Sequence, residues 1–198
     1  MRIPLFPLHA VLFPGAALPL HVFEERYRRL VREGRDFGVV LIRHGWEVGE
    51  GRADDIWQVG TLATPERVDQ LPDGRYFVLA RGTRRFRVIS TEQTEPYPTG
   101  EVEWLPDPRQ RAGPHLLELL RRYLDAYGVE LTSDLARRRG MRAVWLVGDL
   151  LQVEALKRQQ LLEAGDPGLA ERLLEEELIK IQRLGRLASM RPPRVSKN

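Results

Sequence analysis

The 198-residue chain contains no cysteine, and only three of its 31 basic residues are lysines. The missing thiols exclude disulfides, zinc ribbons, iron–sulfur clusters and cysteine nucleophiles. A nucleotide-binding P-loop needs a lysine directly after a glycine, and none of Lys157, Lys180 and Lys197 follows one. The net charge is only +3, so no strong overall field draws the chain onto nucleic acid.

Long uninterrupted apolar runs are also missing. The segment from Ile3 to Leu20 is nearly all apolar, as in a signal peptide, but prolines interrupt it at positions 4, 7, 14 and 19. Proline removes a backbone donor and clashes with the preceding helical turn, so the segment predicts short strands and turns. No run of 18 apolar residues occurs elsewhere. We therefore expect a soluble, cytoplasmic protein with no membrane partner.

Patterns for metal binding are lacking as well. His21, His44 and His115 each precede a glutamate by three residues, but none has a second histidine one helical turn further on. A zinc-protease helix requires that second histidine. The sequence therefore predicts no metal site and no cofactor.

The two halves of the chain differ in composition and in the spacing of their apolar residues. Residues 1–108 hold short apolar runs separated by proline and glycine, whereas residues 109–190 are rich in leucine, glutamate, arginine and alanine at helical spacing. Pro106-Asp107-Pro108 marks the boundary, because closely spaced prolines continue neither a helix nor a central strand. We expect a β domain over 1–108, a helical bundle over 109–190 and a disordered basic tail over 191–198.

The first half predicts seven or eight short strands and one helix. The helix covers Glu24–Glu33, where the apolar residues fall on one face. Leu71-Pro72-Asp73-Gly74 predicts a turn, and Gly82-Thr83 predicts the turn of a hairpin between two further strands. The predicted strands are Ile3–Leu5, Ala10–Phe13, Ala17–Val22, Phe37–Ile42, Ile56–Ala63, Arg75–Ala80, Arg84–Thr91 and Tyr97–Leu105, with a loop over Gly45–Asp55. Such short strands favour a small β-barrel or folded sheet.

The second half predicts four or five helices. Asp166 and Pro167 have the residue types of an N-cap and a first helical position, so they predict the start of the longest helix. The segment Ala143–Leu151 is apolar on nearly all sides, which predicts that it lies at the centre of the helical half with Trp145 buried. The fold class expected from the whole chain is α+β.

Several ordered segments resemble the N-terminal domain of the Lon protease family, and they extend from residue 3 to about 190. These segments are Pro4-Leu5-Phe6-Pro7-Leu8, Leu12-Phe13-Pro14-Gly15, Leu18-Pro19-Leu20-His21-Val22-Phe23-Glu24-Glu25-Arg26-Tyr27-Arg28, Val59-Gly60-Thr61-Leu62-Ala63, Leu71-Pro72-Asp73-Gly74-Arg75, Gly82-Thr83-Arg84-Arg85-Phe86-Arg87-Val88, Leu150-Leu151, Lys157-Arg158-Gln159 and Leu161-Leu162-Glu163.

The resemblance implies a PUA-like β domain followed by a helical bundle. In Lon this region binds substrate protein and helps to assemble the hexamer, and the ATPase and protease domains follow it. Because this chain stops at Asn198, we expect a stand-alone form. No serine lies in a segment that resembles the Ser–Lys active site of Lon, so the resemblance implies a binding module with no catalytic residues. Its expected partners are exposed or unfolded polypeptide segments, and beyond them a separate ATPase or protease, or further copies of itself.

Two groups of residues are candidate binding sites. Glu24, Glu25 and Arg26 lie at a junction of strand and helix, where backbone donors and side chains converge. The alternative reading of these residues is that they only cap and solvate the helix.

The second group supports an alternative function. Arg81, Arg84, Arg85 and Arg87 surround Phe86, and such a basic strand is a plausible surface for RNA in a PUA-like fold. Strand alternation places Arg85 and Arg87 on one face and Phe86 and Val88 on the other. We expect the arginines to face outward and Phe86 to pack in the core, which weakens the RNA reading.

Overall fold

The structure is a computed structural model that describes residues 1–43, 55–92, 96–108, 112–130 and 142–189. Most of the predicted loop at Gly45–Asp55 and the tail over 191–198 lie outside the described residues. The described part is a mixed α+β fold with six strands and five helices.

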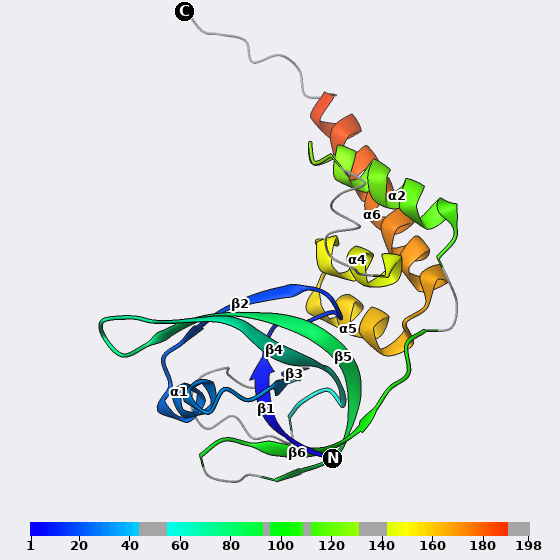
Figure 1. The fold of residues 1–198 in the computed structure, drawn as a ribbon. Helices are drawn as coiled ribbons and strands as arrows, with labels where there is room; N and C mark the ends of the chain where they lie inside the picture. Colours follow the sequence, from blue (N-terminus) through cyan, green and yellow to red (C-terminus); the bar gives the residue numbers. More distant parts are fainter. Residues whose placement is uncertain (44–54, 93–95, 109–111, 131–141, 190–198) are drawn as a thin grey trace, which may run out of the picture.

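The six strands form one mixed sheet (Figure 1). In chain order they are β1 (Arg2–Leu8), β2 (Ala17–Val22), β3 (Phe37–Leu41), β4 (Val59–Gln70), β5 (Tyr76–Glu92) and β6 (Thr99–Trp104). Their order in the sheet is β2-β5-β4-β3-β1-β6, with β1 and β3 parallel. Because β6 also pairs with β5, the sheet folds back on itself.

Strand β5 is long enough to pair with two different strands along one edge. Its first part pairs with β2 over Tyr76–Arg81, and its second part pairs with β6 over Phe86–Glu92. The hairpin turn predicted at Gly82-Thr83 is therefore wrong, because β5 runs straight through these residues. Glycine is needed at 82 for another reason: a Cβ there would lie 2.3 Å from the carbonyl oxygen of Phe13, where the chain crosses the strand.

The turn predicted at Leu71–Gly74 is confirmed. It joins β4 to β5 at the tip of the projecting hairpin (Figure 1). Gly74 has φ of +82°, and its amide donates to the carbonyl of Leu71. This left-handed backbone is open to glycine and strained for most other residues, so the local sequence determines the turn.

The helices fall into two places. α1 (Glu25–Arg32) lies alone beside β2, while α2 (Pro114–Asp125), α4 (Ala143–Leu150), α5 (Ala155–Ala164) and α6 (Pro167–Ser189) gather at the other end of the molecule (Figure 1). α5 lies nearest to the sheet. The predicted first helix is confirmed, and so is the cap at Asp166, whose Oδ1 accepts the amide of Gly168 at 3.0 Å. Ala10–Phe13, predicted as a strand, lies in none of the six strands.

Two apolar clusters occupy the interior. The smaller one contains Phe86 and Val88, which confirms that both side chains point inward. The larger one is continuous from the sheet into the helices, and it includes Tyr27 of α1 and Leu120 of α2. Burial of apolar surface therefore links the two halves of the chain.

Trp145 lies in this larger cluster with 1% of its surface exposed, as the apolar helix predicts. α4 contacts α2, α5 and α6. On the side towards the sheet, the Trp145 ring lies 6.0 Å from the ring of Phe13, between centroids. Trp145, predicted to lie at the centre of the helical half, thus also packs against a residue of the first half of the chain.

Candidate functional site

The junction predicted as a binding site joins β2 to α1. Arg26 forms an ion pair with Glu24 at 2.9 Å, and its guanidinium lies 4.7 Å from the centroid of the Tyr27 ring. Glu25 pairs with Arg28 and Arg32 along the helix. The two carboxylates at the positive end of α1 therefore already have cationic partners within the chain.

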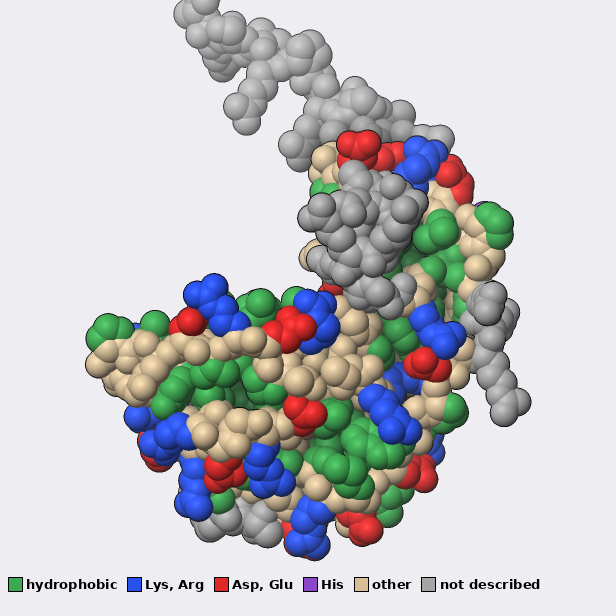
Figure 2. Space-filling model, in the orientation of Figure 1, with side chains coloured by type: hydrophobic (Ala, Val, Ile, Leu, Met, Phe, Trp, Pro, Cys, Tyr) green, Lys and Arg blue, Asp and Glu red, His purple; other side chains and the backbone are tan. Residues whose placement is uncertain are grey.

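A small hollow of about 160 Å³ opens beside this junction. Its lining includes Phe6, Leu20 and Tyr27, and the neighbouring Phe23 is 48% exposed. Figure 2 shows hydrophobic side chains that reach the surface between the projecting hairpin and α1. Burial raises the pKa of Tyr27 to about 12, so its ring stays neutral and packs as part of the core. The role of Glu24, Glu25 and Arg26 in binding stays a prediction.

Arg85 corrects the prediction of an outward row of arginines. Only 7% of its surface is exposed, because α5 covers this part of β5. Its guanidinium donates to the carbonyls of Leu162 at 2.6 Å, Glu163 at 3.1 Å and Pro106 at 2.8 Å. It also lies 4.8 Å from the centroid of a Trp145 ring. Burial lowers the pKa of Arg85, but a guanidinium remains protonated.

The other arginines of this group do not act together. Arg81 is held by the carboxylate of Glu66 and the carbonyl of Gly15. Arg84 lies over the ring of Trp104, and the half-exposed Arg87 is 3.8 Å from Glu103. Arg85 is inside the protein. Four arginines that are adjacent in sequence thus do not form one open surface for phosphates.

α5 is attached to the sheet by polar side chains that reach backbone carbonyls. Gln159, almost fully buried, donates to Val59 of β4 at 2.9 Å. Arg158 donates to Gly148 of α4 at 3.0 Å, and burial lowers its pKa. With Arg85 these contacts tie β4, β5, α4 and α5 together. Each carbonyl would lose a buried partner if α5 moved, so the orientation of α5 on the sheet is well determined.

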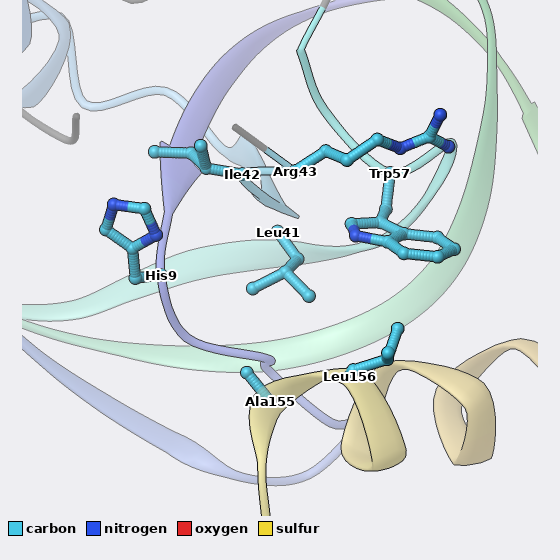
Figure 3. Close-up of a pocket in the computed structure, with 7 residues that line it drawn as sticks. All are labelled: His9, Leu41, Ile42, Arg43, Trp57, Ala155 and Leu156. Carbon is cyan, nitrogen blue, oxygen red and sulfur yellow. The ribbon is translucent and has the colours of Figure 1, made fainter. Parts of the chain in front are cut away.

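An open cleft of about 650 Å³ lies where α5 begins, beside the end of β3 (Figure 3). In Figure 3, Leu41 points from its strand towards the helix, while Trp57 and His9 lie on opposite sides of it. Leu156 is 45% exposed. The lining residues are His9, Leu41, Ile42, Arg43, Trp57, Ala155 and Leu156.

Arg43 is the one arginine or lysine among the described residues of this lining. Its guanidinium lies 4.7 Å from the centroid of a Trp57 ring, an arrangement in which the cation faces the electron-rich ring. Within the described residues, no carboxylate forms an ion pair with Arg43. The cleft therefore offers apolar surface with a cation at its rim that has no acidic partner in the described part of the chain.

The sequence did not identify this cleft, because its residues come from four separated segments of the chain. One signal was present. Leu156 falls on the polar face of α5, in line with the exposed Gln160 and Glu163. A single exposed leucine is common on protein surfaces, so Leu156 is informative only once α5 is seen to border the cleft.

Two further features are absent from the described residues. In the described ranges, no three His, Asp or Glu side chains come together as a metal would require. Among the same residues, no helix combines the length and the apolar character needed to cross a membrane.

Comparison with known proteins gives a family match over most of the chain. Residues 2–178 match the family model of the ATP-dependent protease La (LON) substrate-binding domain. Lon protease 2 from Syntrophobacter fumaroxidans is 32% identical over 177 residues, which are 82% of this chain and 22% of that protein. Lon protease from Porphyromonas gingivalis is 37% identical over 101 residues, or 49% of this chain and 12% of that protein. The chain thus matches less than a quarter of the length of these relatives.

Solved structures agree with the family match. The crystal structure of a Lon N-terminal domain protein from Xanthomonas campestris is 33% identical, with a TM-score of 0.63, and the match covers 90% of this chain and 98% of that one. The N-terminal domain of Mycobacterium avium complex Lon protease is 16% identical with a TM-score of 0.58, over 89% and 97% of the two chains, and supports the fold alone. The chain belongs to the Lon substrate-binding domain family.

Proposed function

We propose that this protein is a non-catalytic module that binds exposed or unfolded segments of polypeptide. The open apolar cleft between the end of β3 and α5, in a chain of this family, carries the proposal. Unfolded chains present apolar side chains without a fixed shape. A cleft that is apolar inside and open to solvent can accept many such side chains, so we expect weak and broadly specific binding.

The proposal is tested by titration with a permanently unfolded, fluorescently labelled polypeptide. The Leu156→Asp variant places a charge in the cleft and should bind roughly tenfold more weakly, because burying a leucine contributes about 1.5–3 kcal/mol. Leu117→Asp is the matched control, since Leu117 is also a helical leucine and is 42% exposed on α2. Absence of binding by the unaltered protein, or equal loss in both variants, would contradict the proposal.

The partners beyond polypeptide are part of the same proposal. A module that captures unfolded segments without cutting them is useful as an adaptor, which would bring them to a separate ATPase or protease in the cytoplasm. Self-association through the helices is the alternative. Pull-down from the native lysate, followed by size analysis of the captured complexes, separates these two cases.

We also propose an architecture for the chain: a PUA-like small β-barrel over residues 1–108 and a helical bundle over 109–190. The pairing of β6 with both β1 and β5 supports the barrel, and the contacts of α4 with α2 and α6 support the bundle. Limited proteolysis of the whole chain tests the division, since the first cuts should fall at the boundary near Pro108.

A further inference from the structure

The charge of the residues that line the cleft indicates which polypeptide segments it prefers. Among the described residues, its lining contains one guanidinium and no carboxylate. The guanidinium of Arg43 is positioned over Trp57, so its place at the rim is determined by the ring. In the described residues its charge is not neutralised by any ion pair. A fixed cation beside an apolar cavity distinguishes ligands by charge.

We propose that the cleft selects segments in which an acidic side chain lies close to a large apolar one. This inference rests on the proposed function. The apolar side chain enters between Leu41 and Leu156, and the carboxylate meets the N–H groups of Arg43. In an extended chain, side chains two positions apart lie on the same side, so an acidic residue at that spacing satisfies both contacts.

An internal acidic residue fits better than the carboxylate at the end of a chain. The cavity is open to solvent and, at about 650 Å³, has room for more than one side chain. A chain can therefore enter and leave it without ending there. A basic residue at the same position would face Arg43, and repulsion between like charges would disfavour it.

Three short peptides test the proposal, each acetylated and amidated so that no terminal charge remains. The first contains aspartate two positions before a single leucine in a Gly/Ser background. In the second, lysine replaces the aspartate, and in the third, serine replaces the leucine. With a neutral fluorophore and low salt, the first should bind roughly three- to tenfold more tightly than the second. The third should bind most weakly, and salt should reduce the preference for aspartate.

Variants of the protein assign the preference to Arg43. Arg43→Glu should reverse the order of the aspartate and lysine peptides, and Arg43→Gln should remove the difference. Arg87→Glu is the matched control, because Arg87 is an exposed arginine on β5, outside the cleft lining. It should leave the order unchanged. Circular dichroism of each variant confirms that the fold is retained.

The outcomes separate this inference from the function on which it rests. Equal affinity for the aspartate and lysine peptides, or a preference that survives Arg43→Glu, overturns the inference. If the unfolded polypeptide still binds and Leu156→Asp still weakens it, the proposed function stands. If a peptide with a free carboxyl terminus binds tightly while its amidated form does not, the cleft reads chain ends and the inference is overturned.

Discussion

In two regions of the surface an arginine lies over an aromatic ring, but the two arginines have different surroundings. At the β2–α1 junction, Arg26 lies over Tyr27, and in the cleft Arg43 lies over Trp57, with the same 4.7 Å from guanidinium carbon to ring centroid. The surroundings differ. Glu24 neutralises Arg26 at 2.9 Å, and both side chains are only 20% exposed, whereas Arg43 is exposed and has no carboxylate partner in the described residues.

Stacking on a ring does not by itself decide whether an arginine serves the fold or a ligand. A guanidinium over a ring is positioned, but its charge serves the fold when a carboxylate of the same chain meets it. When none does, the charge is left for a ligand. Arg85 over Trp145 is the extreme case, because three backbone carbonyls take its hydrogen bonds inside the protein.

The largest expected effect concerns the buried aromatic residue. Trp145→Ala should lower the free energy of unfolding by roughly 3–5 kcal/mol, because it removes a large side chain from a site with 1% exposure. Thermal unfolding followed by circular dichroism measures this. Since Trp145 packs against Phe13, we also expect one transition rather than two. A shift of only a degree or two in Tm would show that the ring is not part of the core.

The next effect concerns the cation beneath α5. Arg85→Met should cost roughly 2–4 kcal/mol, because it leaves three carbonyls without their buried donor. Urea denaturation measures the loss. Arg87→Met, at the exposed position two residues further on, should change stability by less than about 0.5 kcal/mol. Similar losses in the two variants would refute the structural role of Arg85.

Tyr27 makes the stability of the fold depend on pH, whereas Trp57 has no group that titrates. Its pKa is raised by burial from 10.0 to about 12, so the neutral form is favoured in the folded state. The resulting stability is complete below pH 10 and is lost as the pH rises through 12. At pH 11 the loss should be about 1.4 kcal/mol, by the value of one pKa unit. Tyr27→Phe should lose correspondingly less stability than the unaltered protein between pH 9 and 11, measured by urea denaturation.

The smallest effect compares the two arginine–aromatic pairs directly. Arg26→Gln should destabilise the fold by about 1 kcal/mol, because Glu24 loses its partner in a partly buried setting. Arg43→Gln loses only the contact with its ring, and should cost about 0.5 kcal/mol. Chemical denaturation of both variants tests this order. A greater loss for Arg43→Gln would assign that residue to the fold instead of to a ligand.

Features that depend on local sequence were predictable. The helix at Glu24–Glu33, the turn at Gly74 and the cap at Asp166 each depend on residues within one or two turns of one another. The burial of Trp145 followed from a helix that is apolar on all sides. The family resemblance, carried by many short segments in order, is shown by the comparisons.

Features that depend on long-range contacts were not predictable. Gly82 resembles a hairpin turn in sequence, but it is there because Phe13, 69 positions earlier, crosses the strand at 2.3 Å from where its Cβ would lie. Arg85 alternates like an outward residue, yet two of its three partners are carbonyls of α5, which no local pattern reveals. The cleft has the same cause: Arg43, Trp57 and Leu156 meet only once α5 lies on the sheet.

We propose the cleft as the place where polypeptide binds, and the β2–α1 junction is the competing site. Amide chemical-shift mapping with an unfolded polypeptide tests this proposal most directly, because both regions are observed in one titration. We expect the largest shifts at Leu41, Trp57 and Leu156, with Glu24, Glu25 and Arg26 unmoved. Shifts concentrated at Phe23–Tyr27 with none in the cleft would contradict the account.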